Sequence, residues 1–183
     1  MMKRYLLVLG LLVVLGGWGC SMVTSGRPIG DTPLLVDAGE WEGTWTSADG
    51  GPVVVRVEDA RKGQLRLAWM EGGREMVLKT ADVMLLKAGT WHFANLREET
   101  KGGPPVYLFA RVKKEKGMLI IWPPRPERFA RLINDKVLPG TASKEKIFLG
   151  ELGPEHVKVI ASEERGVLFD WENPIVIMRT SER

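Results

Sequence analysis

Few residues of this chain have the types and spacing that chemistry requires. Its 183 residues include one cysteine, Cys20, and two histidines, His92 and His156. A thiolate is a nucleophile, whereas neither histidine has a second ligand at the spacing of zinc sites. The sequence also lacks the Gly-x-Ser-x-Gly, His-Glu-x-x-His and glycine-rich phosphate-binding motifs. We therefore predict a non-enzymatic protein without metal or cofactor. Acid/base carboxylate pairs stay open, because folding rather than spacing brings them together.

The residues before Cys20 have the pattern of an export signal. Lys3 and Arg4 provide a positive start, an apolar stretch runs over residues 5–15, and glycines at 16, 17 and 19 follow. A membrane-spanning helix needs about 20 mostly apolar residues, and this stretch is roughly half as long. A cleaved secretory signal over residues 1–19 is the favoured interpretation, and an uncleaved anchor is the alternative.

Gly19 followed by Cys20 resembles the cleavage site of bacterial membrane lipoproteins. The resemblance implies a diacylglyceryl group on the Cys20 thiol, cleavage on its amino side and three acyl chains, such as palmitate, on the mature residue. Several acyl chains anchor a protein stably in a membrane, because each buried CH₂ contributes about 0.8 kcal/mol. Ser21, in place of Asp, implies the outer membrane, facing the periplasm. An ordinary signal with an incidental cysteine is the alternative.

Charge and size narrow the classes of partner. Removing Lys3 and Arg4 from the 26 basic residues leaves 24 against 23 acidic ones, so nothing favours nucleic acid as a partner. The mature chain is long enough for one domain with one core, and its single cysteine forms no internal disulfide. We expect a lipidated Cys20 and flexible tether over residues 20–39, of which residues 21–33 span roughly 20 Å, and a single β-rich domain over residues 40–183.

Short alternating strands separated by glycine-bearing turns predict the fold of that domain. We expect strands at 53–58, 65–70, 74–80, 83–87, 90–96, 106–112, 118–122, 146–152, 156–161 and 175–178. Gly72 and Gly73 predict a tight hairpin turn with positive φ angles. Helices are expected from Pro126, and from Ser162 as N-cap. The fold class is mainly β, an antiparallel meander forming a small barrel or sandwich, with one or two short helices in the C-terminal half.

Trp41, Gly43 and Trp45 resemble the first-strand Gly-x-Trp of lipocalins and other calycin barrels. The resemblance implies that Trp45 plugs one end of a barrel and that Arg179 from the last strand packs on it through a cation–π contact. Ordinary core aromatic residues on a strand are the alternative. Trp45, Trp69 and Arg179 are the candidate ligand-binding residues. Further residues are expected to face inward: Val53, Val55, Val57, Leu67, Trp69, Phe93, Leu108 and Ile120.

Two classes of function remain at this point. The favoured one is an envelope lipoprotein held at the membrane through Cys20, acting as a structural or protein-interaction module with an unknown envelope partner. The alternative is a calycin-like carrier that binds an apolar small molecule inside the barrel. Interior volume separates them, because ligand sites are cavities of several hundred Å³. A filled interior favours the interaction protein.

Overall fold

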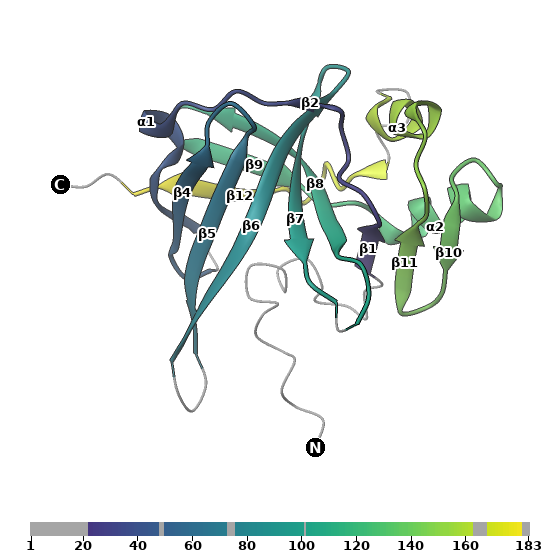
Figure 1. Ribbon diagram of the computed structural model, residues 1–183, viewed down its shortest axis with the longest axis horizontal. Coiled ribbons are helices and arrows are strands. Elements are labelled where there is room, and N and C mark those ends of the chain that lie inside the picture. Colours follow the sequence, from purple (N-terminus) through teal and green to yellow (C-terminus); the bar gives the residue numbers. More distant parts are fainter. Residues whose placement is uncertain (1–21, 48–49, 73–75, 101, 163–167, 181–183) are drawn as a thin grey trace.

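The chain folds around a closed antiparallel β-barrel (Figure 1). The computed structural model describes residues 22–47, 50–72, 76–100, 102–162 and 168–180. Within them, eight strands close the barrel in the order β8-β7-β6-β5-β4-β3-β12-β9, and β9 returns to β8. Their bounds are β3 Gly43–Ser47, β4 Val53–Asp59, β5 Gln64–Glu71, β6 Val77–Ala88, β7 Trp91–Glu98, β8 Val106–Glu115, β9 Met118–Trp122 and β12 Ile175–Arg179.

The meander from β3 to β9 follows the predicted alternation of apolar and polar residues. Val53 and Val55 are buried, whereas Val54 between them is 46% exposed. The turn between β8 and β9 has positive φ angles at Lys116 and Gly117, as a two-residue hairpin requires. The β12 strand then inserts between β9 and β3 and closes the barrel. The predicted fold class is confirmed.

A second layer covers the outside of the wall formed by β7, β8 and β9. It contains β1 (Met22–Ser25), β10 (Gly140–Ala142), β11 (Lys146–Leu149), α2 (Pro126–Asn134) and α3 (Pro154–Ala161), which lie together to one side of the barrel (Figure 1). The β1 strand pairs in parallel with β11 and antiparallel with β8. A dense apolar core fills the space between this layer and the barrel wall, and its aromatic members include Phe93, Phe109, Phe129 and Phe169.

The buried cation of this outer core is Arg111 on β8, whose side chain is fully shielded from solvent. Its guanidinium carbon lies 4.4 Å from the ring centre of Trp91 and 4.5 Å from that of Phe169. Its Nη2 donates to the carbonyl of Ile160 at 2.7 Å, at the end of α3. The aromatic rings and the carbonyl replace water around the charge, and they tie α3 to the barrel.

The expected tether over residues 20–39 is wrong for the part that the structure describes. Val23 is 2% exposed and Ile29 is fully buried, because β1 completes the second layer and Ile29 hydrogen-bonds the Asn95 side chain through both its N–H and its carbonyl. β2 (Thr32–Pro33) then pairs with β6, and α1 (Ala38–Trp41) follows with Asp37 as its N-cap. The folded domain therefore begins no later than Met22, and Cys20 lies outside the described residues.

Two expected elements of the C-terminal half differ from the structure. Residues 156–161 form most of α3 rather than a strand, because Pro154 suits the first turn and His156 Nδ1 accepts from the Gly153 N–H at 2.9 Å. The helix expected between Ser162 and the Asn173–Pro174 stop lies outside the described residues over 163–167. It is wrong over 168–172, where the chain forms no α-helix, and Ser162 itself ends α3. The helix from Pro126 is confirmed as α2.

The strands expected at 74–80 and 83–87 belong to one continuous strand, β6. The expected hairpin with β5 is confirmed, because Met70 on β5 pairs with Leu78 on β6. Gly72 does not have the positive φ angle expected of it, and Gly73 lies outside the described residues. None of the helices in the described part of the chain is long and apolar enough to cross a lipid bilayer.

Candidate ligand-binding cavity in the barrel

The barrel interior is hollow. Its cavity has a volume of about 560 Å³ and is lined by apolar side chains from all eight barrel strands. They alternate along each strand with outward residues, as the pleat requires. Representative lining residues are Val55, Leu67, Leu85, Leu96, Val112 and Ile177. This volume lies within the range of about 300–1,000 Å³ that is typical of small-molecule sites.

Small side chains on two neighbouring strands account for part of the space. Ala94 on β7 is directly paired with Ala110 on β8, and both line the cavity. Inward positions filled by large residues would close a barrel of this size, whereas two adjacent alanines leave room beside their methyl groups. The lining therefore favours an apolar guest without hydrogen-bonding requirements deep in the barrel.

One end of the cavity is closed by α1 and two indoles. Trp45 on β3 is 1% exposed, and its Nε1 donates to the Trp41 carbonyl at 2.9 Å. Arg179, the last residue of β12, is paired with Trp45, and its Nη1 donates to the Gly39 carbonyl at 2.6 Å. Gly43 has φ +125°, and a β-carbon there would lie 3.1 Å from Arg179 Nε. Glycine at this position therefore lets the guanidinium lie across the base of the barrel.

At the other end the cavity opens through a gap in the wall. Along residues 111–115 the β8 strand pairs with β9, but along Tyr107 and Leu108 its partner on that side is β1. The wall parts between β1 and β9, and the cavity reaches the rim there. The rim consists of Met22, the segment Pro123–Glu127 and Asp170.

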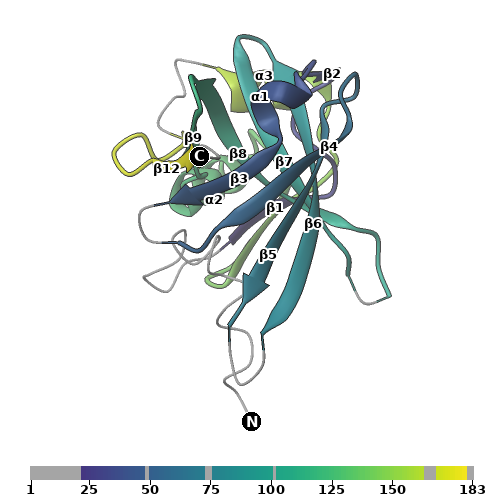
Figure 2. The ribbon, with the colours of Figure 1, turned by 90° about the vertical axis from the view of Figure 1, so that its left-hand side faces the viewer.

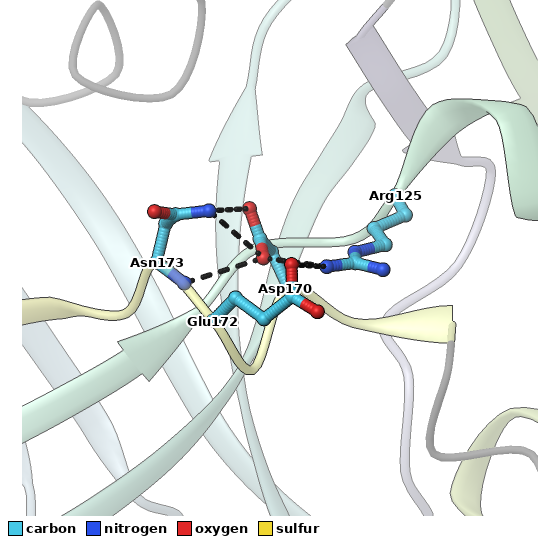
Figure 3. Close-up of polar contacts among 4 residues, drawn as sticks. All are labelled: Arg125, Asp170, Glu172 and Asn173. Atoms are coloured by element: carbon cyan, nitrogen blue, oxygen red, sulfur yellow. Dashed lines mark hydrogen bonds and ion pairs between the residues drawn. The ribbon is translucent and has the colours of Figure 1, made fainter.

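An ion pair fixes the polar part of this rim (Figure 3). Arg125 Nη2 lies 3.0 Å from Asp170 Oδ1 and 3.1 Å from Glu172 Oε2. Partial burial opposes ionisation of Asp170, but hydrogen bonds from Arg125 and Asn173 outweigh it and hold the pKa of Asp170 below its ordinary value. The hydrogen bond to Asp170 likewise raises the pKa of Arg125. The pair stays charged, and each charge is compensated.

The backbone on either side of this ion pair is joined as well. The Arg125 N–H donates to the Leu168 carbonyl at 2.7 Å, and the Asp170 N–H donates to the Pro123 carbonyl at 2.8 Å. The segments 123–125 and 168–170 are therefore held together at the rim by two backbone hydrogen bonds and by the Arg125–Asp170 ion pair.

None of the protein-family models, curated proteins or solved structures with which we compared the chain matches it.

The structure separates the three candidate ligand-binding residues. Trp45 lines the closed end of the cavity. Arg179 lies beside it, but its described contact is with the α1 backbone; the cation–π contact at this end is that of Lys114, whose Nζ lies 5.8 Å from the Trp41 ring. Trp69 is not among the lining residues, and its Nε1 is buried without an acceptor in the described part of the chain.

Two of the expected inward residues lie on the wrong face. Phe93 packs fully buried in the outer core, and Ile120 packs against the same core. Their neighbours Ala94, Leu119 and Ile121 line the cavity instead. The second layer makes both faces of β7 and β9 apolar, so alternation alone does not say which face is inside. A parity count from Val112 across the Lys116–Gly117 turn would have placed β9 correctly.

The histidines do not combine into a metal site. His92 is on β7, where burial, together with the positive charge of Lys87, lowers its pKa. His156 caps α3 as described above. Among the described residues, no three His, Cys, Asp or Glu side chains gather in a way that would hold a metal ion.

A second hollow, of about 290 Å³, lies among polar side chains that include Glu58, Arg66, Asp82 and Arg97. Arg66 Nε lies 2.9 Å from Asp82 Oδ1 and 3.8 Å from Glu58 Oε1, so its charge is compensated within the hollow. It offers a guest less apolar surface than the barrel interior does.

Proposed function

We propose that this protein is an apolar-ligand carrier of the bacterial envelope, held at a membrane through a lipidated Cys20. The observation that supports a carrier is the cavity of about 560 Å³, lined almost entirely by aliphatic and indole side chains. A closed base, a continuous apolar lining and a polar rim suit an elongated guest such as an acyl chain, whose polar end stays at the rim. An interaction module needs no such cavity.

The attachment part of the proposal is supported by the sequence before Cys20. Intact mass spectrometry of protein extracted from membranes tests it, with Cys20→Ser as the control variant. We expect the parent mass to equal residues 20–183 plus one glyceryl unit and three acyl chains, and the variant to lack both the glyceryl and the acyl mass. A parent of full length without acyl groups contradicts the attachment.

The carrier function is tested by ligand retention. Protein purified from cells is extracted with organic solvent, the extract is analysed by mass spectrometry, and binding of a fluorescent fatty acid is measured by titration. Ala94→Phe places a large ring inside the cavity and is expected to weaken both signals. Val54→Phe is the matched control, because Val54 is 46% exposed on the outer face of β4. An equal signal in the two variants, or no bound molecule and no probe binding in the parent, contradicts the proposal.

A further inference from the structure

The charged groups of the barrel cavity are confined to its rim. Among the lining residues that the structure describes, the charged ones are Arg125, Glu127 and Asp170, and all of them lie at the rim. The other lining residues are aliphatic, aromatic, methionine or proline residues, and the Nε1 of Trp45 already donates to the Trp41 carbonyl. A guest therefore meets apolar surface along its length, and its polar end belongs at the rim, where hydrogen-bonding partners and water are within reach.

The volume of the cavity fits one acyl chain. A cavity of about 150 Å³ holds one benzene molecule, so about 560 Å³ gives room for roughly 20 carbon atoms. One chain of common length fits within that number, whereas a diacyl lipid has two such chains and does not fit. Both views of the ribbon show α2, which begins at the rim, well away from α1 at the closed end (Figures 1 and 2). A chain that enters at the rim therefore extends toward α1 and stops there.

The cation at the rim, Arg125, is held between two carboxylates (Figure 3). Its Nη2 lies 3.0 Å from Asp170 Oδ1 and 3.1 Å from Glu172 Oε2. Asp170 is fixed in turn by Asn173, which donates to it through its backbone N–H and its Nδ2. An anionic guest at this guanidinium would add a third negative charge beside two that are already there, and like charges at short range repel each other.

The amino terminus of α2 is compensated in the same way. The start of a helix attracts anions through its partial positive charge and its free N–H groups. Here the first residue, Pro126, has no N–H, and the N–H groups of Arg128 and Phe129 donate to the Arg125 carbonyl at 3.0 and 3.3 Å. Glu127 adds a carboxylate in the first turn. In the described part of the rim, the helix start and the guanidinium are thus both already compensated.

The formal charge of the rim is negative. Arg125 contributes one positive charge, whereas Glu127, Asp170 and Glu172 contribute three negative ones, which gives a net charge of −2. The side chains of Arg125 and Asp170 are only 23% and 25% exposed, so water and salt screen these charges less than they would on an open surface. The rim therefore disfavours a guest with a carboxylate end relative to one with an uncharged end.

We propose that the barrel selects a single acyl chain whose polar end carries no negative charge, such as an ester, and that Asp170 and Glu172 set this selectivity by occupying Arg125. This inference rests on the proposed carrier function, and it names the class of guest. A free fatty acid binds through its chain, but its carboxylate finds no available cation at the rim.

Competition between two guests with the same chain tests this selectivity. Tetradecanoic acid and its glycerol monoester each compete with the fluorescent fatty acid for protein prepared as for the carrier test, and the concentration that displaces half of the probe gives the affinity. We expect the ester to bind about fivefold more tightly than the acid, which is the effect of one partly exposed ion pair.

A double variant, Asp170→Asn with Glu172→Gln, makes Arg125 available to a guest. We expect its affinity for the acid to rise about fivefold, with its affinity for the ester unchanged. The unchanged affinity for the ester shows that the cavity is intact. Glu172→Gln alone, at a side chain that is 80% exposed, should shift the preference in the same direction by a smaller factor.

The matched control removes two carboxylates beside an arginine that is not on the rim. It combines Glu58→Gln with Asp82→Asn around Arg66, in the second hollow, and so changes the net charge of the protein by the same amount. The control should keep the preference of the parent. An equal change of preference in the control and in the rim variant overturns the inference, because a general charge effect would then explain both.

The remaining outcomes separate this inference from the carrier function. If the parent binds the acid as tightly as the ester, or if the rim variant keeps the preference of the parent, the selectivity is overturned and the carrier function stands. A diacyl lipid recovered from the purified protein by solvent extraction overturns the single chain. If the parent binds neither guest, the carrier function fails, and the inference fails with it.

Discussion

Ala94 on β7 and Ala110 on β8 lie side by side in the barrel wall, and both methyl groups face the cavity. Because both residues are alanines, neither side chain extends across the cavity toward the opposite wall. This pairing of two small residues makes the interior volume sensitive to single substitutions, so the state of the cavity can be tested through stability as well as binding.

Ala110→Leu is expected to raise the free energy of unfolding of ligand-free protein by about 1 kcal/mol, because the added carbons are buried against existing apolar walls. Denaturant unfolding measures this difference, with Val54→Leu on the outer face as the control. An interior that is already filled would instead lose about 1–3 kcal/mol through overpacking.

The amino-terminal strand is expected to be part of the folded domain. Val23→Asp places a charge at a position that is 2% exposed, and we expect it to lower the free energy of unfolding by about 3 kcal/mol or more. The adjacent Met22→Asp, at a position that is 39% exposed, is the matched control and should cost less than about 1 kcal/mol. Equal effects would mean that β1 does not pack on the barrel.

Arg111 is expected to contribute strongly to stability. Arg111→Ala removes the cation between Trp91 and Phe169 and leaves the Ile160 carbonyl without its donor. We expect a loss of about 3 kcal/mol in the free energy of unfolding. Lys113→Ala, two residues along the same strand, removes an exposed cation and should change it by less than about 1 kcal/mol. A small effect of Arg111→Ala would show that the outer core repacks.

The rim ion pair gives stability a dependence on acid. Because hydrogen bonds lower the pKa of Asp170 in the folded protein, its contribution is fully present above the ordinary carboxyl pKa of 3.8 and is lost as the pH falls through the folded value. We expect Asp170→Asn to reduce the loss of the free energy of unfolding that the parent shows as the pH falls below about 4.

Asp59→Asn is the control for this measurement, because Asp59 also has a lowered pKa but is not on the rim. Asp59→Asn should leave the contribution of the rim ion pair to the free energy of unfolding unchanged at low pH. The effects of the two substitutions on that free energy should therefore be additive. The lowered pKa of His92 acts separately, below its ordinary value of 6.5, where protonation of the unfolded chain reduces stability. If the free energy of unfolding falls equally with pH in Asp170→Asn and in the parent, the rim ion pair does not contribute to stability.

Local patterns predicted those elements whose two faces differ. The β4 strand begins at Val53 as predicted, because its apolar and polar residues alternate, and α2 begins at Pro126, because a proline suits the first turn of a helix with one apolar face. Where both faces of a strand are buried, the alternation of apolar and polar residues no longer indicates which face lines the cavity. Phe93 was expected inside the barrel, yet the outer core takes it, since β1 and the helices bury that face as well.

Segments from distant parts of the chain form the site, which is why no short motif revealed it. The rim joins Met22, Pro123–Glu127 and Asp170, and the wall opens because β8 exchanges β9 for β1 along its length. The segment around Met22 looked like a tether, because its Ser, Gly and Pro content carries no apolar period. Its burial depends on pairing with Lys146–Leu149, more than 120 residues away.

By itself, the sequence determined an export-type amino terminus, a lone thiol and an antiparallel meander with one clear helix, because charge, chain order and hydrophobic period are local properties. Only the tertiary structure decided that the barrel is hollow, that β1 belongs to the layer packed on it, and that the opening lies beside Met22. The interior volume depends on side chains from all the strands and on the register in which they pair. The space beside Ala94 exists only because β8 brings Ala110 next to it.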